Sequence, residues 1–303
     1  RRSPDLFRVV RTGACIGPAG ARNLGFASTG AERVLFLDND VALGEGAAGL
    51  LCRALDEDQQ AVLAMPRILY AAAPGTIQYD GAACHFSGLM TLVHQGLPAA
   101  ETGRETRRID SIVTACFLVD RRRWGGEPLF DDSFFIYLED HDLGLRTRVA
   151  GKGILSVPAA ACLHREGTPG LSIRISGRYS RRRIEAHIRN RWQVILKCYS
   201  LRSIVLLLPF FLVFEAGQLL LAIRKGWFFI WLGSLLWLGR RLPAVLRRRA
   251  RIQAGRRTPD REILSGGRLP TRPELAGSGL ERAALRLLDR CAELYWRAVS
   301  ALL

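Results

Sequence analysis

Short apolar runs and amphipathic segments alternate along the first half of the chain. The apolar runs predict strands at residues 6–10, 33–37, 61–66, 112–119 and 154–157. Segments with the helical spacing of apolar positions predict helices at residues 18–27, 45–58 and 137–150. Strands that alternate with helices are typical of an α/β domain. The run from Val34 to Leu37 is apolar enough to be buried on both faces, which favours a mainly parallel sheet.

Longer apolar segments follow in the second half. Residues 203–223 contain a single charged side chain, Glu215, and residues 227–238 contain none. The first segment is long enough to span a bilayer, whereas the second is shorter. Apolar residues at helical spacing after Leu280 predict an amphipathic helix. These patterns divide the chain into an α/β domain at 1–175, a basic and apolar helical region at 176–250, a linker at 251–279 and a final helix at 280–303.

Charge is distributed unevenly between the two halves. The formal net charge is +16, yet residues 1–170 hold 18 Lys and Arg against 20 Asp and Glu, whereas residues 171–303 hold 26 against 8. The sequence has no zinc-finger, homeodomain or RNA-recognition motif, which argues against nucleic acid as a partner. Basic residues that border apolar segments favour anionic membrane lipids instead. Residues 203–238 are therefore predicted to span a bilayer, or to re-enter or lie along it, with a buried helical pair in a soluble protein as a third alternative.

Acidic residues come directly after one predicted buried strand. Asp38 and Asp40 follow the run at 33–37, at the strand end where open α/β sheets place ligand-binding groups. Two carboxylates one residue apart can share a hard divalent cation and leave positions open for phosphate oxygens. The alternative interpretation is a turn, because Asp and Asn favour turns after strands. The seven cysteines suggest no competing metal site, since they are widely spaced and include no Cys-x-x-Cys pair.

A second acidic cluster opens the helix predicted at 137–150. Glu139, Asp140 and Asp142 lie in its first turn, where carboxylates complement the helix dipole. Three acids in four residues exceed what capping requires, so one of them is a candidate general base. His164 follows the last predicted strand; a lone histidine is more often structural, and its position alone makes it a candidate ligand.

The order of these motifs resembles the family-2 glycosyltransferases with the GT-A fold, in particular their bacterial rhamnosyltransferase-like branch. The matching segments are Gly17–Gly25, Val34–Val41, Ala115–Val119, Phe130–Arg146 and Gly151–Pro158, followed by His164. The resemblance implies a GT-A domain followed by a helical membrane-associated region. It also implies an inverting, metal-dependent transferase that moves a sugar from a nucleotide diphosphate sugar to an acceptor hydroxyl.

Roles for individual residues follow from the same resemblance. Asp140 matches the general base of the family. The residues implied at the donor are Arg22, Asn23 and Asp38, those implied at a Mg²⁺ or Mn²⁺ ion are Asp40, Asp38 and His164, and the candidate acceptor-site residues are Glu139, Asp142 and Cys116. The family's glycan or lipid-linked acceptors would suit an enzyme held at the cytoplasmic face of the bacterial inner membrane.

Two departures from the family pattern limit what is implied. The family's opening strand, with an acidic residue that reads the nucleobase, is expected upstream of Arg1 and is absent from this sequence. Thr114 stands where relatives usually have glycine, so the details of the acceptor pocket do not carry over.

Rhamnose is a candidate sugar. The alternative function is a catalytically inactive sugar-binding or scaffold protein at the membrane, against which the intact Asp38, Asp40 and Asp140 argue.

Overall fold

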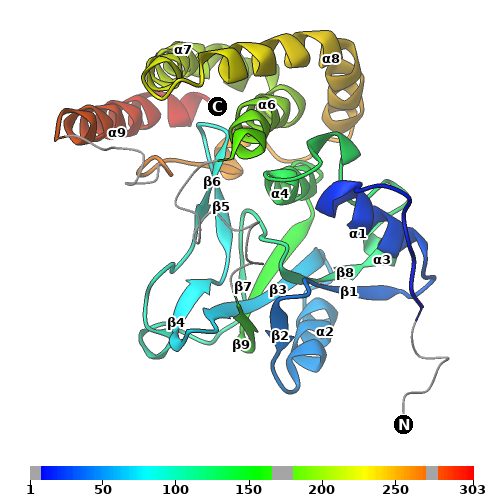
Figure 1. The fold of residues 1–303 in the computed structure, drawn as a ribbon. Coiled ribbons are helices and arrows are strands. Elements are labelled where there is room, and N and C mark those ends of the chain that lie inside the picture. The colour runs from blue at the N-terminus through cyan, green and yellow to red at the C-terminus, as the bar shows by residue number, and fades with distance from the viewer. Residues whose placement is uncertain (1–7, 166–179, 271–278) are drawn as a thin grey trace.

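The computed structural model describes residues 8–165, 180–270 and 279–303 (Figure 1). Its central sheet has the strand order β1-β8-β3-β9-β2, with β4 paired to β3 and β7 paired to β9, and a smaller sheet has the order β10-β5-β6. The strands are β1 (Arg33–Leu37), β2 (Val41–Leu43), β3 (Ala61–Tyr70), β4 (Ala73–Tyr79), β5 (Ala82–His85), β6 (Leu89–Leu92), β7 (Arg107–Arg108), β8 (Cys116–Asp120), β9 (Gly153–His164) and β10 (Leu264–Ser265). The helices are α1 (Gly17–Ala27), α2 (Ala47–Glu57), α3 (Arg121–Trp124), α4 (Glu139–Val149), α6 (Arg181–Cys198), α7 (Leu201–Arg224), α8 (Phe228–Ala254) and α9 (Gly279–Val299).

The central sheet is mixed, so the prediction of a mainly parallel sheet is wrong. Within the described residues β3–β9 is its one parallel pair, whereas β1–β8, β3–β8, β2–β9, β3–β4 and β7–β9 are antiparallel. The apolar run in β1 was misleading because apolar character reports burial and carries no information about strand direction. β1 ends the strand order, and its side chains from Arg33 to Phe36 are only partly buried. Residues 8–10, the described part of the strand predicted at 6–10, are not in a strand.

Helices cover both faces of this sheet, which explains why its strands are apolar on both sides. On one face α2 packs against β3 and β9, with Leu51 and Leu55 fully buried. On the other face α1 and α4 contribute Ala19, Phe26 and Leu143 to a second core (Figure 1). The α/β class predicted from the alternating pattern is thus confirmed, and the middle of α1, the end of β1 and the start of α4 meet on one side of the sheet.

The C-terminal helices are attached to this domain through α6. α6 packs against α4, and Val194 and Ile195 share a core with Leu145 of α4. The hairpin between β5 and β6 also touches α6. At its turn Gly88 has a φ of +82°, and a Cβ there would lie 2.7 Å from the Ile195 side chain. Only glycine meets both conditions without strain.

α7 and the first part of α8 lie on the side of α6 that faces away from the central sheet, and α9 lies beside α7 (Figure 1). These three helices form the outer part of the helical region. α7 and α8 are long and apolar enough to cross a membrane, with mean hydropathies of 2.3 and 1.2 in their most apolar stretches. Part of the segment predicted as a linker is ordered into secondary structure, because α8 continues to Ala254 and β10 pairs with β5. The amphipathic helix predicted at 280–303 corresponds to α9, which spans Gly279–Val299.

Candidate active site

Arg22 joins two of the motifs that the sequence separates widely. Its guanidinium donates to Asp38 Oδ1 at 2.8 Å and to Glu139 Oε1 at 3.3 Å. Asp38 follows β1, where its backbone N–H donates to the Ala115 carbonyl at 2.8 Å and fixes the strand end. Three elements, α1, β1 and α4, therefore bring their charged residues to one place.

Asn23, the neighbour of Arg22, has a different set of contacts. Its side-chain amide donates to the Phe130 carbonyl and to Asp132 Oδ1, and its oxygen accepts from the Phe130 backbone N–H at 2.8 Å. These bonds tie α1 to the segment that leads into α4. In this structure the Asn23 side chain is hydrogen-bonded within the protein, where it positions the site.

The turn before α4 has an unusual backbone that sets the direction of its first residues. Phe135, Tyr137 and Leu138 have φ values of 59°, 66° and 62°, a conformation that costs free energy in residues other than glycine. The amide of Asn190 on α6, which is 2% exposed, stabilises the turn by donating to three carbonyls of the loop. These belong to Phe134, Ile136 and Tyr137, at 3.1, 3.0 and 2.7 Å.

The carboxylates of Glu139 and Asp140 are both largely removed from water. Burial raises the pKa of Asp140 to about 6, against the hydrogen bond from the His141 backbone N–H and the charge of Arg22, which lower it. Burial and the neighbouring Asp140 carboxylate raise the pKa of Glu139 to about 7, and Arg22 opposes this. Glu139 Oε2 is buried without a hydrogen-bond partner among the described residues. A carboxylate poised near neutrality suits a general base.

Asp40 and His164 form a second pair at this side of the sheet. β2 pairs with β9 so that Val41 lies opposite His164, which brings Asp40 Oδ2 to 3.3 Å from His164 Nε2. The other ring nitrogen, Nδ1, lies 2.7 Å from Gln78 Oε1. An Nδ1–H that donates to Gln78 leaves a lone pair on Nε2 that faces the Asp40 carboxylate.

This pair fits a divalent cation. Carboxylate oxygen and imidazole nitrogen are both ligands of Mn²⁺ and similar ions, and an outer hydrogen bond from the ligating histidine is the usual way its ring is oriented. In residues 8–165, 180–270 and 279–303 no three side chains of His, Cys, Asp or Glu are grouped closely enough to hold an ion. A cation held by Asp40 and His164 alone would keep coordination positions open for a ligand.

The sequence did not single out Gln78 or Tyr79, two residues at the end of β4 that belong to this region. Gln78 is 5% exposed and orients His164. Tyr79 is 4% exposed. Burial raises the pKa of its hydroxyl, and the negative charges of Asp38 and Asp140 raise it further. Neither residue lies in a recognisable motif. The strand that brings them to the site was not predicted, because it lies in the Gly-rich stretch 67–108.

Two predicted acceptor-site residues, Asp142 and Cys116, are instead fully buried. Asp142 bonds to Lys197 Nζ at 2.7 Å and Arg146 Nε at 2.8 Å. Cys116 packs with its sulfur 3.9 Å from that of Cys162. Helical spacing explains the first case, since the third acidic residue of the turn faces α6 and not the site. We do not propose either residue as an acceptor contact.

Loss of Lys197 is expected to destabilise the fold strongly. Its ammonium group is fully buried and bonds to Asp131 and Asp142, both at 2.7 Å. Although burial raises the pKa of Asp131, Lys197 lowers it to about 2. Lys197→Ala leaves two buried carboxylates without this partner and should cost about 3–5 kcal/mol of unfolding free energy.

Thermal and urea unfolding of the Lys197→Ala variant measure this effect. The control is Arg122→Ala, which removes an exposed ion pair with Glu32 and should change stability by less than about 0.5 kcal/mol. Equal stability of the two variants would show that Asp131 and Asp142 do not depend on the buried ammonium.

No protein-family model and no curated protein sequence matches the chain. Among solved structures, a crystal structure of GalNAc-T7 with UDP, GalNAc and Mn²⁺ matches with a TM-score of 0.50 and 17% sequence identity. The fold resembles that of a GT-A glycosyltransferase.

This similarity concerns the fold. It covers 64% of the present chain and 37% of the GalNAc-T7 chain. The GT-A resemblance predicted from the motif order is confirmed at this level. Membership of family 2 and of the rhamnosyltransferase-like branch stays a prediction.

Proposed function

We propose that the chain transfers a sugar from a nucleotide diphosphate sugar to an acceptor hydroxyl, with inversion at the anomeric carbon and with a Mg²⁺ or Mn²⁺ ion. The observation that carries the proposal is the convergence at Arg22, which links Asp38 after β1 to Glu139 beside Asp140. The GT-A-like fold supports a nucleotide-sugar donor. The neighbouring structure contains UDP, GalNAc and Mn²⁺, which supports the class of donor and of cofactor.

In this proposal Asp40 and His164 hold the cation. When bound, the ion supplies Lewis-acid stabilisation of the negative charge that develops on the departing diphosphate. The Arg22 guanidinium lies 2.8 Å from the Asp38 carboxylate and holds it in place. In this proposal Asp38 contacts the donor. The same guanidinium balances part of the charge of Glu139 and Asp140, and so keeps two neighbouring carboxylates compatible with a buried site.

Asp140 acts as the general base. The acceptor oxygen forms a bond to the anomeric carbon, its proton passes to the Asp140 carboxylate, and the bond from the anomeric carbon to the diphosphate oxygen breaks. A single displacement of this kind inverts the anomeric configuration and needs no covalent nucleophile. The turn at 135–138, which Asn190 clamps, fixes the direction of the carboxylate, and positioning of this type contributes strongly to rate.

We also propose the finer details as expectations. The acceptor is a cell-envelope glycan or a lipid-linked glycan, and rhamnose from a dTDP-sugar is the first donor to test. A screen of dTDP-, UDP- and GDP-sugars with Mg²⁺ and with Mn²⁺, read out as release of nucleoside diphosphate, tests both the activity and the donor. Absence of turnover and of donor binding across the whole panel would favour a sugar-binding or scaffold role.

Transfer should lose rate on the acid side of neutrality. The base must be ionised to accept a proton, and burial raises the pKa of Asp140 to about 6. The rate is therefore expected to be at its plateau above about pH 7 and to fall about tenfold per pH unit below about pH 6. Steady-state kcat at saturating donor and metal measures this. A profile that stays flat down to about pH 5 would mean that no carboxylate of raised pKa serves as the base.

A further inference from the structure

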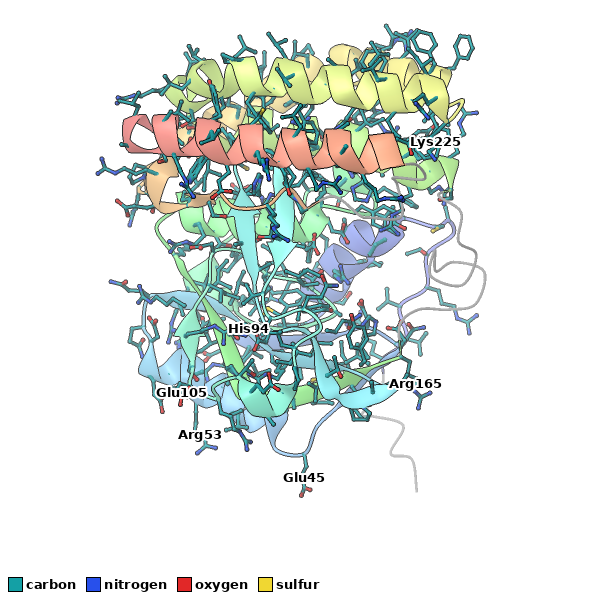
Figure 2. All side chains as sticks on the ribbon, turned by 90° about the vertical axis from the view of Figure 1, so that its left-hand side faces the viewer. Glu45, Arg53, His94, Glu105, Arg165 and Lys225 are labelled. Atoms are coloured by element: carbon teal, nitrogen blue, oxygen red, sulfur yellow. The ribbon has the colours of Figure 1, made fainter. Side chains whose placement is uncertain are left out.

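The outer face of α7 is an apolar stripe that no described part of the chain covers. Figure 2 shows α7 lying across the top of the molecule, next to α9, with Lys225 just beyond one end. The exposed side chains of the stripe are large and aliphatic, namely Leu201, Val205, Leu208, Leu212, Val213, Leu220 and Ile223. Only 22% of the most apolar stretch of α7 is buried. An exposed apolar surface of this length marks an interaction site.

Neighbouring helices extend this surface. Phe229 and Leu236 of α8 and Leu287 and Leu294 of α9 are exposed, Phe229 at 81%. Figure 1 shows α7 and the first part of α8 on the side of the molecule opposite the central sheet, with α9 next to them. The apolar surface is thus spread over three helices of an outer layer, and we call it the platform.

The inner side of α7 is bound to the rest of the molecule by polar contacts. Glu215, the one acidic residue of this helix, accepts from Arg191 at 2.6 Å and from Trp192 at 2.9 Å, both on α6. Trp231 of α8 lies 3.4 Å from its second oxygen. Arg191 is 1% exposed, so a movement of α7 away from α6 would leave a buried guanidinium without its carboxylate.

Both ends of the layer are held as well. The Ser200 backbone N–H before α7 donates to Asp260 at 2.7 Å, and Arg248 of α8 pairs with Asp131 at 3.1 Å. The Tyr295 hydroxyl of α9 donates to the Leu206 carbonyl. These contacts fix the helices along the domain. They oppose an orientation in which α7 and α8 stand upright through a bilayer.

Charge on the layer identifies the kind of partner. Exposed basic residues on α7–α9 and the turn after α7 include Arg202, Arg224, Lys225, Arg240, Arg241, Arg247, Arg286, Arg290 and Arg297. The acidic residues of these helices are engaged: Glu215 with Arg191, Glu281 with Arg224, Asp289 with the Leu269 backbone and Glu293 with Arg297. An apolar surface with a surplus of exposed cations complements an anionic lipid surface.

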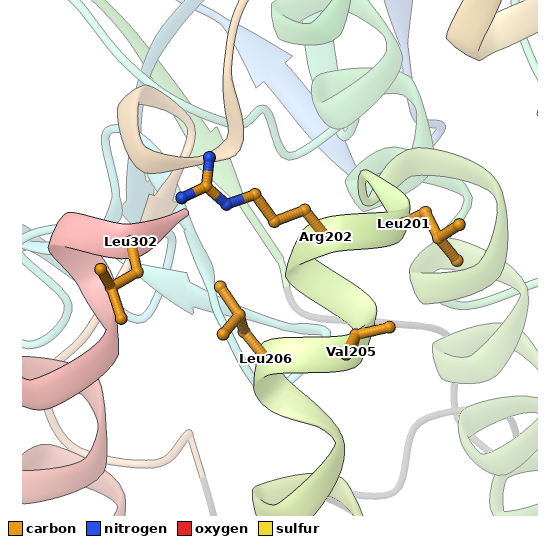
Figure 3. A pocket seen from close by; sticks show the side chains of 5 residues that line it. All are labelled: Leu201, Arg202, Val205, Leu206 and Leu302. Atoms are coloured by element: carbon orange, nitrogen blue, oxygen red, sulfur yellow. The ribbon is translucent and has the colours of Figure 1, made fainter.

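A pocket at one end of the platform likewise combines apolar side chains with a basic one. It has a volume of about 410 Å³ and is lined by Leu201, Arg202, Val205, Leu206 and Leu302. In Figure 3 the Arg202 side chain extends from α7 toward the last turn of the chain, beside the apolar side chains. Aliphatic walls with one guanidinium match an acyl chain that ends in a phosphate headgroup.

We propose that the platform lies in the plane of an anionic phospholipid bilayer, with α7 at the level of the headgroups and upper acyl chains. In this orientation neither α7 nor α8 crosses the membrane. The turn at Lys225 then stays on the same side as the α/β domain. The proposal does not depend on the transferase activity, because it follows from the surface of the layer and its inner contacts alone.

Vesicle flotation with the full chain tests the partner. Binding to vesicles of phosphatidylglycerol and phosphatidylcholine should exceed binding to pure phosphatidylcholine at least about tenfold, because several cations contribute. Leu212→Glu with Leu220→Glu should reduce binding at least about tenfold. The control, Val9→Glu with Leu97→Glu, adds the same charge at exposed apolar positions outside the platform and should bind like the wild type. Equal loss in both double variants, or no binding to anionic vesicles, would overturn the proposal.

Labelling of Lys225→Cys decides between the two orientations. The exposed Cys15 and Cys291 are first replaced by serine. On vesicle-bound protein added from outside, a membrane-impermeant maleimide should modify the introduced thiol without detergent. Protection until the vesicles are dissolved would show that the helices cross the bilayer and would overturn the in-plane orientation.

Discussion

Asp140→Asn should abolish sugar transfer while donor affinity stays close to that of the wild type. The amide keeps the shape of the side chain and cannot accept the proton of the acceptor hydroxyl. General-base assistance is worth about 10²- to 10⁴-fold in rate, so kcat should fall by that factor. Because burial raises the pKa of Asp140, its neutral replacement should also fold at least as stably as the wild type.

Single-turnover kinetics and calorimetry with the donor separate the two quantities. Glu139→Gln is the matched comparison, since Glu139 is the adjacent carboxylate and shares Arg22. A near wild-type rate in Asp140→Asn together with a large loss in Glu139→Gln would move the base to Glu139. Near wild-type rates in both variants would remove general-base catalysis by this cluster.

Asp40→Ala should abolish metal-dependent donor binding. His164 lies 3.3 Å from the Asp40 carboxylate. In Asp40→Ala only His164 would remain to hold the cation, and the negatively charged ligand would be lost. Removal of several kcal/mol of charge stabilisation corresponds to a loss of affinity of about 10²-fold or more. Titration calorimetry with donor in the presence and absence of Mn²⁺ measures it.

Two further variants sharpen this test. Gln78→Ala removes the hydrogen-bond partner of His164 and should weaken metal affinity by about 10- to 100-fold. Asp56→Ala, which changes an exposed carboxylate paired with Arg33, should leave the donor affinity unchanged. Unaltered metal-dependent binding in Asp40→Ala would exclude Asp40 and His164 as the cation site.

The sequence predicted the parts of this site that lie in short motifs at strand and helix ends. Asp38, Asp40 and the cluster at Glu139 lie where an α/β sheet places ligand-binding groups. Arg22 is beside two of these groups in the structure, although 117 residues separate it from Glu139. Their proximity became predictable only through the order of motifs, which resembles a known fold.

Other features could not be predicted, for identifiable physical reasons. Strand direction in the central sheet was wrong because apolar runs look the same in parallel and antiparallel strands that are covered on both faces. Asp142 lies in the same helical turn as Glu139, yet it forms a buried ion pair with Lys197 of α6 and so has a structural role. Gln78 and Tyr79 contribute from a strand without a motif. Each of these facts depends on a tertiary neighbour that local sequence does not specify.

The helical region shows the same limit. Composition left open whether residues 203–238 span a bilayer, lie along it or form a buried pair. In the structure α7 and α8 are mostly exposed, at 22% and 11% buried over their most apolar stretches, and Glu215 binds Arg191. The contact that favours an in-plane orientation joins two helices, and neither hydropathy nor charge count could reveal it.

The most direct test of the central claim is nucleoside diphosphate release by the full-length protein, with Mg²⁺ or Mn²⁺ and with membranes that supply acceptor. We expect that at least one dTDP-, UDP- or GDP-sugar is turned over, that a chelator stops the reaction, and that Asp140→Asn stops it without loss of donor binding. Turnover that persists in Asp140→Asn and without metal, or a panel in which no donor is bound or consumed, would contradict it.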